Sequence, residues 1–164
     1  MTDLVAHLTR QAAFSRATFG PGPRTKGVQD HIRKELDEIE DVYSNPENHI
    51  DVQPVLSQHS AEAQVHRAAA AEWTDVAILG LDGLTRAISA AHPDWHFSLV
   101  AAKAVEMIVA KQGKNELRDW PDWRTMSADK AIEHDRTKDI DDEIPHFGNA
   151  PPPGTEIDPT EGFD

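Results

Sequence analysis

The chain has 164 residues and no cysteine, and its 29 acidic and 16 basic side chains give a formal net charge of −13. This length predicts one domain with a real core, and the lack of cysteine excludes disulfides, zinc–thiolate sites and thiol catalysis. The charge argues against a nucleic-acid partner, because phosphate contacts need clustered Lys and Arg. No stretch reaches the length of a membrane span and the N-terminus lacks a secretory pattern, so we expect a soluble cytoplasmic protein with no membrane partner.

The first third of the chain predicts two helices separated by a loop. Residues 3–16 are expected to form a short helix, and two Gly and two Pro place a loop over residues 18–24. A strong helix follows from about residue 27 to residue 43, since its apolar side chains recur at the helical spacing of three and four. This apolar stripe consists of Val28, Ile32, Leu36 and Ile39. On a helical wheel Glu35 lies at the edge of the stripe, and Glu38 lies just beyond it.

The rest of the chain predicts two more helices and no strand. Residues 44–60 hold Pro and Asn and few periodic apolar residues, so they are expected to connect two elements. A helix begins near Ala61, Pro93 interrupts the helical pattern, and another helix spans roughly residues 95–118. From Thr137 onward the chain is acidic and rich in Pro, which is typical of a disordered tail. The fold class is therefore expected to be all-α.

Two pairs of acidic residues are the main functional signal. Glu35 with Glu38, and Glu72 with Asp75, are each spaced i, i+3, so both acids of a pair project from one helical face. A solvated acidic surface is the alternative, because surface helices often carry such pairs. However, Glu35 and Glu72 lie beside apolar residues, where an unpaired carboxylate is costly to bury. Di-iron bundles use Glu-x-x-His pairs instead. The pattern favours a site for Mg²⁺ or Mn²⁺, ions that mostly serve phosphate chemistry.

Two further features lie on expected helices. Lys111, Asn115 and Arg118 share one face of the last helix, where they could contact phosphate oxygens. Taken alone, this pattern is better explained by an ordinary polar surface near a helix C-terminus, where cations favour the helix dipole. His31 precedes Glu35 by one turn, and we expect it to make a structural hydrogen bond.

The sequence resembles the all-α nucleoside triphosphate pyrophosphohydrolases related to MazG. The signature of that family is E-E-x-x-E on one helix followed by E-x-x-D on the next, and this chain reads KELDE from Lys34 and EWTD from Glu72. Its first acid is thus replaced by Lys34. Over most of residues 14–136 the chain is similar to the dATP/dGTP pyrophosphohydrolase branch, which includes the phage MazZ proteins. The blocks that carry this similarity are FSRATFGPGPRTKGVQDHIRKELDEIE, EWTDVAILGLDGLTRA, AKQGKNELRDWPDWR and DKAIEHDR.

The resemblance implies cleavage between the α- and β-phosphates of a purine deoxynucleoside triphosphate, giving the monophosphate and pyrophosphate. Two or three Mg²⁺ or Mn²⁺ ions per site would be required, and Glu38, in preference to Glu35, would orient or deprotonate the attacking water. The implied metal ligands are Glu35, Glu38, Glu72 and Asp75. The implied phosphate-binding residues are Lys111, Asn115 and Arg118, and the candidates for base recognition are Thr18, Phe19 and Arg24.

The resemblance also implies a MazG-like helical bundle assembled as a dimer or a dimer of dimers. The catalytic domain would span residues 1–136 and the disordered tail residues 137–164, with an insertion from about residue 43 to residue 71. The link to phage MazZ proteins favours dGTP over dATP and a role in supplying dGMP for 2-aminoadenine nucleotide synthesis in the host cytoplasm. Two alternatives remain at this point: a housecleaning pyrophosphohydrolase for dUTP or damaged nucleotides, and a non-catalytic helical oligomer.

Overall fold

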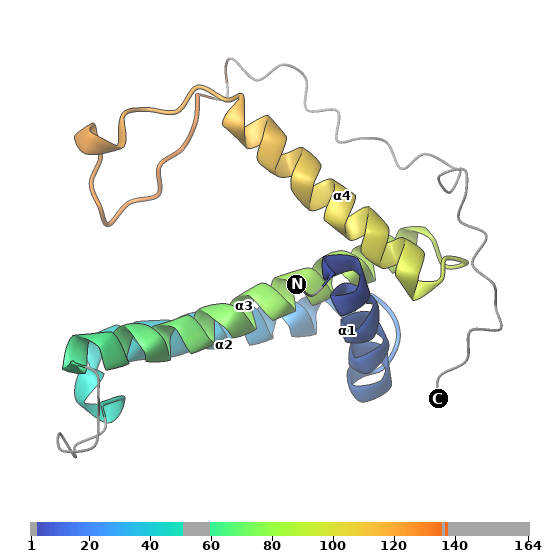
Figure 1. Cartoon of the computed structure of the whole chain (residues 1–164), viewed down its shortest axis with the longest axis horizontal. Coiled ribbons are helices and arrows are strands. Elements are labelled where there is room, and N and C mark those ends of the chain that lie inside the picture. Colours follow the sequence, from blue (N-terminus) through green and yellow to red (C-terminus); the bar gives the residue numbers. More distant parts are fainter. Residues whose placement is uncertain (1–2, 51–59, 136, 138–164) are drawn as a thin grey trace. The chain divides into compact units, whose positions relative to one another are not determined.

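The computed structural model describes residues 3–50, 60–135 and 137, and these residues contain helices and no strand. The α-helices are α1 (Leu4–Phe19), α2 (Thr25–Ser44), α3 (Ala61–Ala91) and α4 (Phe97–Glu116), and the short 3₁₀ helices are η1 (Pro46–Asn48) and η2 (Trp123–Thr125) (Figure 1). The prediction of an all-α fold is confirmed. The expected tail beyond Thr137 lies outside the described residues, as does the middle of the expected connection over residues 44–60.

The chain divides into two compact units, Met1–Val105 and Glu106–Asp164. The boundary falls within α4, and each unit is described by itself. In the described part of the chain, no helix combines the length and the apolar character needed to span a membrane.

Helix α1 begins at a side-chain cap and ends at a glycine. The Asp3 carboxylate accepts a hydrogen bond from the Val5 N–H at 3.0 Å, which satisfies a free donor of the first turn. Residues 18 and 19 were expected in the loop but are helical, because the chain-breaking residues start only at Gly20. Gly20 has a φ of +84°, and its N–H closes the last turn on the Arg16 carbonyl at 3.1 Å.

Helices α2 and α3 lie side by side along their length and form the frame of the first unit (Figure 1). A stripe of buried and half-buried positions runs along α2 at spacings of four and three, through Val28, Ile32, Glu35, Ile39 and Val42, and the half-buried Glu38 lies beside it. Leu36 was expected in this stripe but is 42% exposed, whereas Glu35 is only 6% exposed. The stripe therefore runs through Glu35, and the helix presents a carboxylate where an apolar residue is usual.

Helix α3 also has a stripe of buried and half-buried residues that includes an acid. Its N-terminus is capped by Ser60, whose hydroxyl accepts from the Ala63 N–H at 3.2 Å. A stripe at spacings of three and four then contains Ala69, Glu72, Val76, Leu79, Gly83 and Arg86. A methyl group added to Gly83 would lie 3.5 Å from Val28 of α2, which shows how closely the two helices approach there. Both stripes thus contain an acid among small and apolar residues.

The core of the first unit is completed by α1 and the start of α4. Leu8 and Ala12 of α1 are fully buried, as are Val100, Ala101 and Ala104 of α4. The predicted interruption at Pro93 is confirmed, because α3 ends at Ala91 and α4 begins at Phe97. The core is small, and several large apolar side chains of this unit stay exposed.

Candidate metal centre

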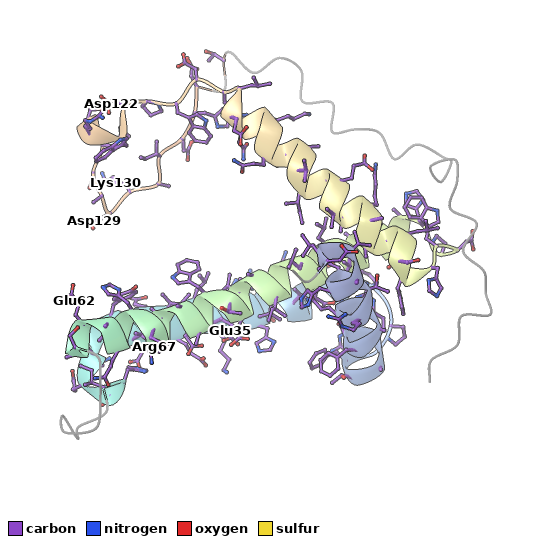
Figure 2. All side chains as sticks on the ribbon, in the orientation of Figure 1. Glu35, Glu62, Arg67, Asp122, Asp129 and Lys130 are labelled. Carbon is purple, nitrogen blue, oxygen red and sulfur yellow. The ribbon has the colours of Figure 1, made fainter. Side chains whose placement is uncertain are left out.

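Three carboxylates gather between α2 and α3. Glu35 and Glu38 from α2 and Glu72 from α3 each offer one oxygen, and these oxygens all lie within 4.8 Å of one another. Figure 2 labels Glu35 along the middle of the α2–α3 pair. Glu35 is buried, and the other two are half-buried. We call Glu35, Glu38 and Glu72 the carboxylate cluster.

The cluster concentrates negative charge. Burial raises the pKa of Glu72, and the neighbouring carboxylates, first that of Glu38, raise it further. Such repulsion is relieved when a cation binds between the acids. Carboxylate oxygens are the ligands that Mg²⁺ and Mn²⁺ prefer, so the donors present fit these ions.

Two basic side chains contact the cluster from α2. The His31 Nε2 lies 2.9 Å from Glu35 Oε1, which is the structural interaction expected for this histidine. The Lys34 Nζ lies 2.9 Å from Glu38 Oε1, and this hydrogen-bonded contact raises the pKa of Lys34 and lowers the pKa of Glu38. Lys34 therefore offsets part of the negative charge and occupies one oxygen of Glu38.

Asp75, the fourth acid predicted as a metal ligand, is exposed on α3 one turn after Glu72. Its carboxylate is not among the three that converge, although its charge contributes to the raised pKa of Glu72. The structure therefore brings together three of the four predicted ligands.

A cavity of about 360 Å³ adjoins the cluster within the first unit. Its apolar walls are Phe19, Gly27, Val28 and Leu79, and its polar walls are Arg24, His31, Asp82 and Arg86. His31 belongs to both features, since it lines the cavity and contacts Glu35. A cavity of this size lies in the range typical of small-molecule sites. Of the residues expected to recognise a base, Phe19 and Arg24 line the cavity, and Thr18 is exposed at the end of α1.

A family model described as dATP/dGTP pyrophosphohydrolase matches residues 7–63 and residues 54–139, which together make up most of the chain. The chain belongs to the dATP/dGTP pyrophosphohydrolase family. The first matched segment contains the two acids of α2, and the second contains Glu72 of α3. The protein is thus an enzyme of the nucleoside triphosphate pyrophosphohydrolase class. Neither the curated proteins nor the solved structures contain a match to it.

The residues of this pyrophosphohydrolase expected to bind phosphate lie in the second unit. Lys111 and Asn115 are on α4, and Arg118 follows the helix directly. The Arg118 guanidinium donates to the Asn115 side-chain oxygen at 2.9 Å, and the Trp120 indole donates to the Asn115 carbonyl at 2.7 Å. Asn115 and Arg118 are half-buried, whereas Lys111 is exposed.

The sequence analysis missed the buried charged residues next to the cavity. Asp82 and Arg86 are 6% and 2% exposed, and Arg86 Nε donates to Asp82 Oδ2 at 2.8 Å. Arg16 of α1 donates to the other oxygen of Asp82 at 3.0 Å. The signal available in the sequence was the i, i+4 spacing of Asp82 and Arg86, which is equally common in exposed ion pairs.

Proposed function

We propose that this enzyme hydrolyses a purine deoxynucleoside triphosphate, dGTP in preference to dATP, to the monophosphate and pyrophosphate with Mg²⁺ or Mn²⁺. The observation that carries the metal dependence is the convergence of three carboxylates from α2 and α3 within the segments that match the family. The preference for dGTP, and a role in supplying dGMP for 2-aminoadenine nucleotide synthesis in a phage-infected cytoplasm, rest on the resemblance to the phage MazZ branch.

The ion-binding residues in this proposal are the carboxylate cluster together with Asp75. Ions held there, two or three per site, would offset the charge of the triphosphate and make water easier to deprotonate. Glu35 is fixed by burial and by His31, so it serves as the rigid ligand. Glu72 joins the cluster from α3, and Asp75 follows it by one turn, so metal binding there would depend on the packing of the two helices.

In this proposal Glu38 orients the attacking water. It is half-buried, so solvent and substrate can reach it. Lys34 lowers the pKa of Glu38, so its carboxylate stays ionised and accepts a hydrogen bond from water. The water oxygen forms a bond to the α-phosphorus while the bond to the oxygen that bridges to the β-phosphorus breaks. The pyrophosphate leaves with that electron pair, and Glu38, with Glu35 beside it, takes the proton of the water.

Substrate contacts complete the proposal. The base would enter the cavity between Phe19 and Arg24, where an aromatic ring and a guanidinium can stack on a purine. Thr18 is a weaker candidate for base recognition. The phosphates would be contacted by Lys111, Asn115 and Arg118.

Assembly with further copies of the chain is part of the same proposal. Leu36, Trp73 and Ile78 on the α2–α3 pair are 42%, 52% and 39% exposed, and exposed apolar groups of this size often mark protein interfaces. We propose a dimer or a dimer of dimers that covers them. The catalytic domain would span residues 1–136, and the segment 137–164 would be dispensable, so truncation after Thr137 should leave turnover intact.

The proposal is tested by incubating the protein with each deoxynucleoside triphosphate in Mn²⁺ or Mg²⁺ and identifying the products. We expect dGTP, then dATP, to give the monophosphate and pyrophosphate. Equal or faster turnover of dUTP would support the housecleaning alternative instead. No turnover of any nucleotide by a folded protein would support the non-catalytic helical oligomer.

A further inference from the structure

Arg86 is the most deeply buried cation in the first unit, and the proposed reaction does not use it. Its side chain is only 1% exposed, although burying a guanidinium is costly unless every polar group finds a partner. A guanidinium has five N–H donors. The Arg86 side chain makes five hydrogen bonds, so all of them are satisfied.

The partners of Arg86 lie on three different segments. On α3 the Nε donates to Asp82, and on α1 one terminal nitrogen donates to the carbonyl and the hydroxyl of Ser15, the hydroxyl at 2.7 Å. The other terminal nitrogen donates to the carbonyls of Gly20 and Gly22, at 3.1 and 2.7 Å. Arg86 therefore attaches the turn between α1 and α2 to α3.

This turn has an unusual backbone. Gly20 and Gly22 have φ values of +84° and +85°, and Arg24 has a φ of +44°, which is costly for a residue with a side chain. The Arg24 guanidinium also donates to the Phe19 carbonyl across the turn. Such a backbone persists only where surrounding contacts hold it, and two of those contacts come from Arg86.

The residues at the two ends of the turn line the cavity. Phe19 precedes the turn, Arg24 ends it, and both line the cavity together with Arg86 itself. His31 also lines the cavity, and its Nε2 lies 2.9 Å from Glu35 of the carboxylate cluster. The proposed function places the base of the nucleotide in this cavity, next to the turn.

We propose that Arg86 is a positioning residue that sets purine selection by fixing the turn 20–24 against the cavity. This inference rests on the proposed function, because the cavity selects a base only if the enzyme acts on nucleotides. In this inference Arg86 acts through the positions of Phe19 and Arg24, and the reaction at the phosphates is left to other residues.

The test compares Arg86→Lys with Arg16→Lys. A lysine at position 86 keeps the positive charge beside Asp82, but its three donors on one nitrogen cannot reach Asp82, Ser15 and both glycine carbonyls. Arg16 is the matched control, because its guanidinium also pairs with Asp82 and otherwise donates to the hydroxyls of Thr85 and Ser89 on α3, whereas the guanidinium of Arg86 donates to carbonyls of the turn. The readouts are kcat and KM for dGTP and dCTP, and hydrogen exchange at the amides of Gly20, Gly22 and Arg24.

We expect Arg86→Lys to speed exchange in the turn and to lower the ratio of kcat/KM for dGTP over dCTP by about tenfold, chiefly through KM for dGTP. Arg16→Lys should leave this ratio within about twofold of the wild type. If both variants lose activity equally on both nucleotides, or if turn exchange is unchanged in Arg86→Lys, the inference is wrong while the proposed function stands. No hydrolysis by the wild type would overturn the proposed function and this inference with it.

A second variant covers the case in which Arg86→Lys does not fold. Gly22→Ala meets no atom within 4 Å but strains a residue with φ of +85°, so it disturbs the turn and leaves the buried ion pairs in place. We expect the same loss of purine preference. An unchanged preference in Gly22→Ala with altered turn exchange would show that the turn does not select the base.

Discussion

The first unit carries two groups of charged side chains that are built in opposite ways, one between α2 and α3 and the other between α1 and α3. In the carboxylate cluster, three acids converge, their charges repel, and the pKa of Glu72 is raised. In the second group, which we call the guanidinium cluster, Arg16 and Arg86 share the carboxylate of Asp82, and all five donors of Arg86 are matched by acceptors. Each group has one member on the stripe of α3, Glu72 in the first and Arg86 in the second.

The difference suggests different roles: the carboxylate cluster binds a ligand, and the guanidinium cluster stabilises the fold. A saturated buried network stabilises only as a whole, because removing one member leaves the others buried and unpaired. A cluster of like charges costs stability until a cation binds, so removing one member should weaken function and relieve repulsion. Substitutions in the two clusters should therefore have opposite effects on stability.

The largest effect on stability is expected for Asp82→Ala. This variant leaves Arg16 and Arg86 without their shared carboxylate, and the free energy of unfolding should fall by about 3–5 kcal/mol. Urea denaturation followed by circular dichroism measures it. The control is Asp30→Ala, which breaks an ion pair with Arg33 whose side chains are both 64% exposed and should change stability little. A loss of less than about 1 kcal/mol in Asp82→Ala would mean that the buried network is not structural.

Glu72→Gln should have the opposite effect to Asp82→Ala: it should reduce turnover without reducing stability. Turnover of dGTP should fall by about 100-fold or more, as is typical when one preorganised electrostatic contact is removed. The melting temperature without metal should stay the same or rise, because the glutamine removes one of the repelling charges. Glu62→Gln, an exposed acid on the same helix, is the control and should keep full activity. A destabilised Glu72→Gln with normal turnover would reverse the roles assigned to the two clusters.

Lys34→Glu should increase the affinity of the carboxylate cluster for a metal ion. It frees the oxygen of Glu38 that Lys34 now contacts and restores the acid that the family signature has at this position. We expect Mn²⁺ to bind about tenfold more tightly, which corresponds to roughly 1.4 kcal/mol. Lys26→Glu changes the net charge equally from the start of the same helix. Equal effects of the two variants would indicate general charge rather than the contact with Glu38.

The smallest effect concerns Asp41, an acid of α2 outside both clusters. Hydrogen bonds from His49 and Asn45 lower the pKa of Asp41 below its usual 3.8. Because the folded pKa is the lower one, this contribution to stability is complete above pH 3.8 and is lost as the pH falls through the folded value. Thermal melts of the wild type and Asp41→Asn should therefore differ at neutral pH and converge in acid. Parallel curves over the whole range would contradict this expectation.

Much of the fold could be predicted from the sequence because its signals are local. The apolar spacing of α2 and the breaks at Gly20 and Pro93 fixed the helices to within a few residues. What could not be predicted is which side of α2 faces α3. Leu36 and Glu35 are adjacent, and only the packing of the second helix decides that the glutamate is buried and the leucine exposed.

The candidate site could also be predicted only as far as local spacing allows. The spacing of the acids within α2 and within α3 predicted which carboxylates share a face, and the structure gathers three of the four. The role of Arg86 had no such signal. An acid and a base at i, i+4 look alike on a surface and in a core, and the partners that matter, Gly20 and Gly22, are more than 60 residues away in the sequence.

The most direct test of the contrast between the two clusters is calorimetric titration of the metal-free protein with Mn²⁺, comparing the wild type with Glu35→Gln. Glu35 is the buried member of the carboxylate cluster, and its amide would remove one ligand charge without changing the shape of the side chain. We predict that the wild type binds Mn²⁺ and that Glu35→Gln, folded by circular dichroism, binds it at least about tenfold more weakly. Equal Mn²⁺ affinity in the two proteins would contradict the assignment of these carboxylates as the metal centre.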